Sequence, residues 1–265
     1  MQLAEERRQS IVEMVDRQGK VLAAELAQQF NTSEDTIRRD LRDLDAAGLL
    51  RRVHGGAMRR TRAEPSFGQR ADADAARKGL LAGALAESVQ PGDTVLVDAG
   101  TTNLAFVRLL EDGHAATIVT NSPRIALELG HLRTTRVLLL GGTYAGHADA
   151  VLGAHTVAEI QRLRVNLAVV GACSVEADRG LGASNIEEAE VKGAMLAAAS
   201  RRVVAVLNER LEAPAPFLIA PLSEVDQLVL EPDVAPDVLA RLRQAERAPD
   251  IRLAGAAHAT GRSKA

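Results

Sequence analysis

Disulfide bonds and membrane spans are both excluded by what this sequence lacks. Its 265 residues contain one cysteine, Cys173, so no disulfide can form within the chain, and a free thiol is typical of the reducing cytosol. No apolar run reaches the ~20 residues that a membrane-spanning helix needs. The N-terminus also lacks the apolar core of a signal peptide. We therefore expect a soluble, cytoplasmic protein with no membrane partner.

The signatures of common cofactor and metal sites are missing as well. No glycine-rich run forms a GxGxxG motif followed by a ribose-binding acid, which argues against a nicotinamide cofactor. His147, Asp149 and His155 have a spacing that fits no compact metal site. Cys173 follows an apolar run without a neighbouring histidine base, so we predict an inert, buried thiol. We expect no cofactor and no metal ion.

Positive charge is concentrated in one stretch, although the net charge of the whole chain is −3. Between residues 36 and 62 there are eight arginines against three acidic residues, a local excess of five positive charges. Such a basic block is typical of a surface that binds a polyanion. The chain is also long enough for one small and one medium domain, each with its own core.

A helix with a basic outer face is predicted inside this block. Ser33 can accept a hydrogen bond from a free N–H of the first turn, and an apolar face follows at helical spacing: Ile37, Leu41 and Leu44. Arg39 and Arg42 lie opposite that face, with Thr36 and Arg38 on its flanks. Guanidinium groups match both phosphates and the O6/N7 edge of guanine. Taken alone, an ordinary surface helix with internally paired charges is the commoner explanation.

The neighbouring segments favour DNA recognition instead. Helical patterns at residues 3–17 and 21–30 precede this helix, and residues 31–32 form a break of the length that a helix-turn-helix uses. After Gly48, residues 49–58 predict a two-stranded wing that turns at Gly55-Gly56. Three helices and a basic hairpin make a winged helix. The same module used for protein contacts would not explain its arginine face.

Residues 3–58 resemble the DNA-binding domain of the DeoR family of bacterial transcription regulators. The resemblance rests on Thr36-Ile37-Arg38-Arg39-Asp40-Leu41, on Leu44, and on the run from Gly48 to Ala57 that ends in His54-Gly55-Gly56-Ala57. It implies that the partner is double-stranded operator DNA. The predicted DNA-contacting residues are Ser33, Thr36, Arg38, Arg39, Arg42, Arg51, Arg52 and His54.

Short apolar runs alternate with helical patterns through the rest of the chain. The apolar runs lie at 94–98, 117–120, 136–140, 167–171, 202–207 and 226–230, and the helical patterns at 74–89, 102–110, 122–129, 154–163, 186–200 and 236–246. Strands that are apolar on both faces and separated by helices indicate a parallel sheet covered on two sides. We therefore predict an α/β main domain with a Rossmann-like sheet, plus a small winged helix-turn-helix domain.

The predicted boundaries follow from composition. Residues 1–58 form the DNA-binding domain, and the polar residues 59–74, with Pro65 and Gly68, form a linker. Residues 75–247 form an effector-sensing domain. The small, polar and aperiodic residues 248–265 predict a frayed tail.

Small polar turns follow the first three predicted strands. They read Asp98-Ala99-Gly100-Thr101-Thr102, then Thr120-Asn121-Ser122, then Gly141-Gly142-Thr143. Ligands of open parallel sheets bind at this edge, and helix N-termini offer N–H groups to anions. Every such sheet needs strand-to-helix turns, but three polar ones on one edge favour a phosphate-bearing ligand.

Residues 75–232 resemble the DeoR-family sensor domain, which is similar in fold to ribose-phosphate isomerase. The resemblance is carried by the turns just named, by Gly153 and Gly180, and by Glu188-Ala189-Glu190-Val191-Lys192. It implies a sugar-phosphate effector, with phosphate near Gly100, Thr101 and Thr102, and sugar nearer Asn121, Glu190 and Lys192. The predicted effector-binding residues are Asp98, Gly100, Thr101, Thr102, Thr120, Asn121, Ser122, Gly141, Gly142, Glu190, Lys192 and Arg210.

Two departures from the family pattern concern this pocket. The chain reads Leu207-Asn208-Glu209-Arg210 where the family usually has an aspartate and a Ser-Lys pair, and Asn166 stands where an aspartate is common. Arg210 keeps a positive charge there, but a planar guanidinium is not a point charge. Glu190 and Lys192 are also about 200° apart on a helix, so both reach one pocket only near its start.

The leading hypothesis is a sugar-phosphate-responsive transcription regulator, a repressor that acts as a homodimer or tetramer. Two recognition helices must reach successive major grooves about 34–36 Å apart, which is why such proteins are symmetric oligomers. The alternative is a sugar-phosphate isomerase-like enzyme with an accessory nucleic-acid-binding domain. An isomerase would need acids after the fourth strand for proton transfer, whereas Gly171-Ala172-Cys173-Ser174 stands there. We therefore predict sensing without turnover, and no catalytic residue.

Overall fold

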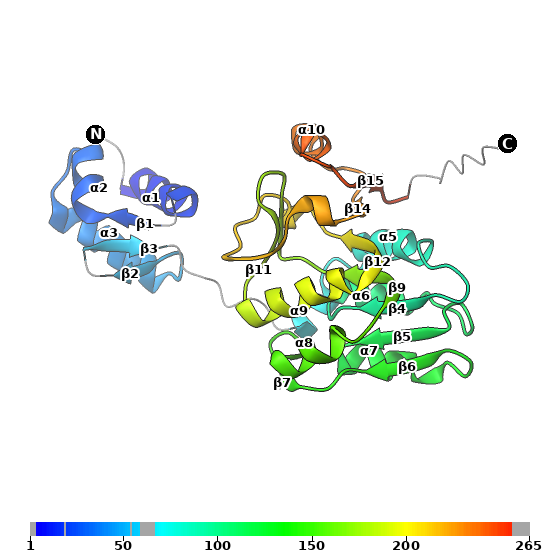
Figure 1. Ribbon diagram of the computed structural model, residues 1–265. Coiled ribbons are helices and arrows are strands. Elements are labelled where there is room, and N and C mark those ends of the chain that lie inside the picture. The colour runs from blue at the N-terminus through cyan, green and yellow to red at the C-terminus, as the bar shows by residue number, and fades with distance from the viewer. Residues whose placement is uncertain (1–3, 19, 54, 59–66, 256–265) are drawn as a thin grey trace. The chain divides into compact units, whose positions relative to one another are not determined.

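The computed structural model describes residues 4–18, 20–53, 55–58 and 67–255. By its internal contacts the chain divides into two compact units, residues 1–65 and 66–265. Figure 1 labels many of the elements of both units. No helix among the described residues is both long and apolar enough to cross a membrane.

The N-terminal unit is a winged helix. Its elements are α1 (Ala4–Gln18), β1 (Lys20–Leu22), α2 (Ala23–Gln29), α3 (Glu34–Ala46), β2 (Arg51–Val53) and β3 (Gly56–Met58). The three helices enclose a core of fully buried apolar residues, among them Ile11, Leu26, Ile37, Leu41 and Leu50. The predicted helices and basic hairpin are thus present.

The wing has a third strand that the sequence did not predict. β1 pairs with β3 in antiparallel register, with Leu22 opposite Gly56. A Cβ atom at position 56 would lie 2.1 Å from the backbone oxygen of Val21, so glycine is required for this close pairing. Residues 21 and 22 were expected to begin a helix, but pairing with the wing holds them extended instead.

The C-terminal unit is built around a seven-stranded parallel sheet with strand order β15-β14-β12-β9-β4-β5-β6. The strands are β4 (Thr94–Val97), β5 (Thr117–Thr120), β6 (Arg136–Leu139), β9 (Val165–Val170), β12 (Ala199–Ala205), β14 (Gln227–Leu230) and β15 (Asp250–Leu253). The helices are α4 (Phe67–Asp72), α5 (Ala75–Ala86), α6 (Thr101–Val107), α7 (Pro123–Glu128), α8 (Ala154–Ile160), α9 (Ile186–Ala197) and α10 (Pro236–Gln244). Three short 3₁₀ turns complete this set: η1 (Leu129–His131), η2 (Asn208–Arg210) and η3 (Leu222–Glu224).

Successive residues of the central strands pack into two different cores. Val95 and Val97 of β4 join the core that holds α5 and α6, whereas Leu96 between them joins the core that holds α9. Strand side chains alternate between the two faces of a sheet, so both faces are apolar and both are covered by helices (Figure 1). The predicted α/β class with a doubly covered parallel sheet is confirmed.

Two small antiparallel sheets accompany the main one. They are formed by β7 (Thr143–Ala145) with β8 (Ala150–Leu152), and by β10 (Ser174–Glu176), β11 (Gly180–Ala183) and β13 (Phe217–Ala220). Their strands are only three or four residues long. Runs this short give too few repeats for a sequence pattern to mark them.

The prediction of a frayed tail over residues 248–265 is wrong in part. Residues 250–253 form β15, which pairs in parallel with β14 along its full length, and Arg252 is buried and forms an ion pair with Glu87. An apolar strand such as β14 gains by having its open edge covered. Residues 256–265 lie outside the described residues.

The expected linker is also partly structured. Residues 67–72 form α4, and Phe67 is buried in the core with α5 and α6. A single large aromatic ring anchors this otherwise polar segment, because burying it removes a large apolar area from water. Residues 59–66 lie outside the described residues.

Candidate functional site

Helix α3 begins as the sequence predicts. Ser33 caps it, and the Ser33 hydroxyl accepts a hydrogen bond from the backbone N–H of Thr36 at 3.2 Å. The hydroxyls of Ser33 and Thr36 are also 2.9 Å apart. Both side chains therefore help to form the first turn of the helix.

The three arginines on this helix are not equivalent. Arg38 donates to Glu34 at 2.6 Å and lies 3.4 Å from Asp35. Arg39 and Arg42 are exposed and have no carboxylate partner among the described residues. Their charge is therefore fully available to an approaching polyanion, whereas that of Arg38 is partly neutralised.

The wing residues are described in part. Arg52 on β2 is exposed. Arg51 belongs to the same strand, but its side chain, and the whole of His54, lie outside the described residues.

Asp40 holds α3 against α1, a role that the sequence did not reveal. The carboxylate is buried, with 5% of the residue exposed, and it accepts a hydrogen bond from Arg7 Nε at 2.7 Å. Arg8 lies 3.8 Å from its other oxygen. An ordinary surface helix would pair such an acid with its own arginines, but Asp40 faces inward and fixes how α3 is oriented.

The main sheet reverses its direction of growth between β4 and β9. The chain runs from β4 to β5 and β6 at one edge, then returns to β9 on the other side of β4 and continues outward. In open α/β sheets, ligands bind beyond the carboxyl ends of the strands at such a switch point. Here those ends lead to Asp98 and Gly171.

Asp98 and Lys192 form a buried ion pair at this point. Asp98 Oδ2 accepts hydrogen bonds from Lys192 Nζ and from the backbone N–H of Gly171, the latter at 3.1 Å. The side chains of Asp98 and Lys192 are only 2% and 7% exposed. Burial lowers the pKa of Lys192, but Asp98 and Glu188 outweigh it, so the pKa is raised and the ammonium stays charged.

The pair borders a cavity of about 30 Å³, lined by Arg70, Asp98, Ala99, Ala148, Ala150, Leu152, Glu188 and Lys192. This is far smaller than the roughly 300–1,000 Å³ of small-molecule sites. Glu188 lies one helical turn before Lys192 and lines the same cavity. The carboxylate and ammonium groups thus converge on a site that is nearly closed.

The turn after β5 braces this edge of the sheet. Asn121 Oδ1 accepts from the N–H of Ala99 at 2.8 Å, and its amide donates to the oxygen of Val151 at 3.4 Å. Thr120 and Ser122 are fully buried and bond within the turn and the first turn of α7. The structure therefore brings Asn121 next to the cavity wall but uses its polar atoms to hold that wall.

Thr101 and Thr102 are half-buried at the start of α6. Gly141 and Gly142 instead pack against α8: Gly141 N–H donates to Glu159 at 2.7 Å, and a Cβ at Gly142 would lie 2.2 Å from the hydroxyl of Thr156. Packing within the chain accounts for this glycine pair.

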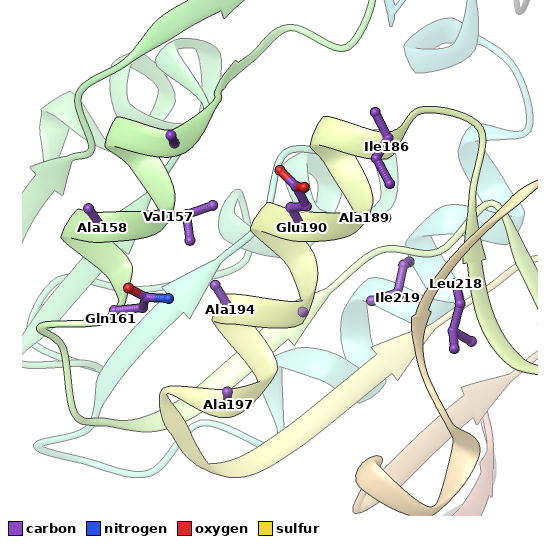
Figure 2. Close-up of a pocket in the computed structure, with 12 residues that line it drawn as sticks. Val157, Ala158, Gln161, Ile186, Ala189, Glu190, Ala194, Ala197, Leu218 and Ile219 are labelled. Carbon is purple, nitrogen blue, oxygen red and sulfur yellow. The ribbon is translucent and has the colours of Figure 1, made fainter.

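Glu190 and Lys192 lie on opposite faces of α9. Glu190 is exposed and points into a groove between α8 and α9 (Figure 2), whereas Lys192 faces the cavity. Glu188 takes the place beside Lys192 that the sequence hypothesis gave to Glu190. The four-residue spacing of Glu188 and Lys192, which puts them on one helix face, is the signal that identifies it.

A buried lysine lies near the start of this unit. Lys78 is buried and donates to the backbone oxygens of Arg70 and of Ala73, the latter at 2.6 Å. Burial lowers the pKa of Lys78, and this effect outweighs the opposing charges of Asp74 and Glu209, while the charges of Arg70 and Arg210 lower the pKa further. Arg210 thus lies near Lys78. The roles of Arg70 and Lys78 were not predicted.

Helix α4 is tied to the cavity wall by aromatic and ionic contacts. The guanidinium carbons of Arg70 and Arg124 lie 6.0 and 5.3 Å from the centre of the Phe67 ring, within cation–π range. Arg124 pairs with Asp149 at 2.5 Å. Asp149 stands between two residues that line the cavity, so α4 and that wall are held together.

Two family comparisons cover most of the chain. The DeoR-like helix-turn-helix domain matches residues 7–63, and the DeoR C terminal sensor domain matches residues 73–231. Among solved structures, ribose 5 phosphate isomerase A from Neisseria gonorrhoeae is 14% identical with a TM-score of 0.38, over 52% of this chain and 54% of that one. A probable sor operon regulator from Shigella flexneri is 13% identical with a TM-score of 0.37, over 52% and 78%.

The similar curated proteins are transcription regulators. The HTH-type transcriptional regulator GlpR of Haloferax volcanii is 32% identical over 86% of this chain and 90% of its own length. The L-fucose operon activator of Haemophilus influenzae is 30% identical over 82% and 88%. The glycerol-3-phosphate regulon repressor of Escherichia coli is 30% identical over 77% and 81%. These relatives favour a regulator over the isomerase alternative, and the chain belongs to the DeoR family of transcription regulators.

Proposed function

We propose that this regulator represses a carbohydrate-metabolism operon and that a phosphorylated sugar controls its affinity for operator DNA. The observation that carries the proposal is the buried Asp98–Lys192 pair at the switch point of the sheet, in a chain whose other unit presents two exposed, unneutralised arginines on α3. The names of the relatives, which refer to glycerol 3-phosphate and fucose, support the class of ligand.

The polar groups around the cavity suit a sugar phosphate. Asp98 and Glu188 can accept hydrogen bonds from sugar hydroxyls, and Lys192 can donate to them. The phosphate fits against Gly100, Thr101 and Thr102, where hydroxyl donors and free backbone N–H groups begin α6.

Gly100 supports this placement because nothing inside the chain requires a glycine there. Its φ of 168° is extended, and an added Cβ would meet only the Asn103 side chain, at 3.7 Å. At Gly142, by contrast, φ is +141° and the space is filled. A ligand that approaches the backbone closely at position 100 would leave no room for a side chain and would therefore favour glycine.

Ligand entry requires the cavity to open. At about 30 Å³ it holds no more than a few waters, and Arg70 of α4 forms part of its wall. Helix α4 is the first described element after residues 59–66, which connect the two units in sequence. We infer that the effector displaces α4 and that this displacement is what the DNA-binding unit responds to.

A thermal-denaturation screen tests the ligand class. Purified protein is heated with a panel of sugar phosphates and with the unphosphorylated parent sugars. We expect a phosphorylated compound to raise the melting temperature, because a ligand that binds only the native state stabilises it. The same compound should be recovered chemically unchanged after prolonged incubation. An equal response to the parent sugar would contradict phosphate recognition, and isomerisation of the compound would contradict sensing without turnover.

A further inference from the structure

A shallow apolar groove of about 610 Å³ lies on the outer side of α9, away from the effector cavity. Figure 2 shows α9 in the middle of this groove, with α8 on one side and β13 on the other. The residues that line it include Gln161, Ile186, Glu190, Gly193, Ala194 and Leu218.

The groove is poor in charge and rich in exposed apolar surface. Glu190 is the one charged residue among the twelve that line it. Ile186 and Leu218 at its rim are 50% and 63% exposed, although both are large apolar side chains. Contiguous apolar surface with few charges is typical of the core of a protein–protein interface.

The geometry points to a second copy of this chain as the occupant, docked about a two-fold axis that passes near Gly193 and Ala194. A two-fold contact needs one surface that carries both ridges and hollows. Here Ile186 and Leu218 are the ridges, and the small residues along α9 and α8 form the hollow. A second copy would also bring the second recognition helix that operator binding demands, so this inference rests on the proposed function in that respect.

Charge complementarity supports the same arrangement. An axis between residues 193 and 194 places Glu190 of one copy opposite Ala197 of the other, because the two positions are equally far from it. Gln161 lines that end of the groove, and Arg164 lies against it, donating to the backbone oxygens of Gln161 at 3.2 Å and of Leu163 at 2.6 Å. Neither Glu190 nor Arg164 has an oppositely charged partner among the described residues, and both are exposed. The two-fold contact pairs them twice.

Helix α9 would also connect the proposed interface to the effector site. Lys192 and Glu188 project from α9 into the cavity, while Glu190 and Ala194 project from the same helix into the groove. A shift of α9 on ligand binding would therefore directly change the contacts with the neighbouring copy.

Charge reversal tests the pairing without DNA or effector, so its outcome does not depend on the regulatory proposal. Sedimentation velocity is measured for the wild type, Glu190→Arg, Arg164→Glu and the double variant. We expect each single variant to weaken association by about tenfold or more, since like charges then face each other at two contacts. The double variant should regain association close to that of the wild type. Arg243→Glu, at an exposed position of α10, is the matched control and should behave like the wild type.

A cysteine placed near the axis gives a second readout that does not depend on weakening the assembly. Ala194→Cys should form a disulfide between two copies under mild oxidation, whereas Arg243→Cys should not. A monomeric wild type would overturn the proposal. Single charge variants that associate as tightly as the wild type, or an Ala194→Cys protein that forms no cross-link, would also overturn it.

Discussion

Asp98 and Lys192 are 94 positions apart in the sequence and form a buried ion pair at the carboxyl end of the parallel sheet. Replacing one partner leaves the other charge buried without compensation, which costs about 3–5 kcal/mol. We therefore predict that Lys192→Met lowers the free energy of unfolding by an amount of this order, measured by urea denaturation.

The matched double variant separates stability from ligand binding. Asp98→Asn combined with Lys192→Met removes both charges, so most of the lost stability should return. The double variant should nevertheless fail to respond to the effector, because neither ionic group remains to recognise it. A double variant no more stable than Lys192→Met alone would show that the pair is not the source of the loss.

The arginines of α3 and of the wing should differ in what they contribute to DNA binding. Arg39→Ala should cost about 1–3 kcal/mol on the best operator and flatten the preference among sequences, because Arg39 is free to reach base edges. Arg38→Ala should cost less, since Glu34 and Asp35 already engage that guanidinium.

The wing should contribute affinity rather than specificity. Arg52→Ala should weaken all duplexes alike and reduce the slope of log K against log salt by about one. Titrations at several salt concentrations, on the best operator and on an unrelated duplex, measure both quantities. Equal loss of specificity in Arg39→Ala and Arg52→Ala would contradict this division.

The effector's phosphate is predicted to need the hydroxyls of Thr101 and Thr102. The Thr101→Val, Thr102→Val double variant removes these donors with little change in volume or branching. Charge-assisted hydrogen bonds contribute roughly 1.5–3 kcal/mol each, so the effector response should fall well over tenfold. Operator affinity without effector should not change. A folded variant with an unchanged response would place the phosphate elsewhere, with Arg210 as the next candidate.

Acid should destabilise the sensor unit partly through Asp112. Hydrogen bonds to this carboxylate from Thr134 and from the backbone N–H groups nearby lower its pKa from 3.8 to about 2. A lowered folded-state pKa means that the stabilisation is present above pH 3.8 and is lost as pH falls towards 2. Asp112→Asn should therefore be less stable than the wild type at neutral pH, and the difference should shrink over that range. Thermal melts at several pH values measure it, and a difference independent of pH would exclude this carboxylate as the cause.

The fold was largely predictable because its central strands are apolar on both faces. Runs such as 94–97 and 167–170 can be satisfied only between two layers of helices. Strand β15 was missed because Asp250 and Arg252 interrupt its pattern. An edge strand tolerates such residues, and only the structure shows that Arg252 forms an ion pair with Glu87.

The sequence predicted that the site lies at the carboxyl edge of the sheet, but not which side chains meet there. Strand order follows from long-range pairing, so the sequence could suggest Asp98 and Lys192 separately but could not bring Gly171 beside them. Packing of α9 against the sheet determines which face of the helix lines the cavity. Glu188 lies on that face and Glu190 does not. The place of Arg70 in the cavity wall was not predicted, because it is set by the burial of Phe67.

Control of operator affinity by a sugar phosphate can be measured directly. Operator affinity is measured by fluorescence anisotropy, on a duplex selected by the protein from a random library, with and without a saturating sugar phosphate that raised the melting temperature. We expect the sugar phosphate to change the dissociation constant by roughly 5- to 150-fold, the usual range of allosteric coupling, in the wild type and not in the Asp98→Asn, Lys192→Met variant. An operator affinity that is the same with and without the bound sugar phosphate in the wild type would contradict this expectation.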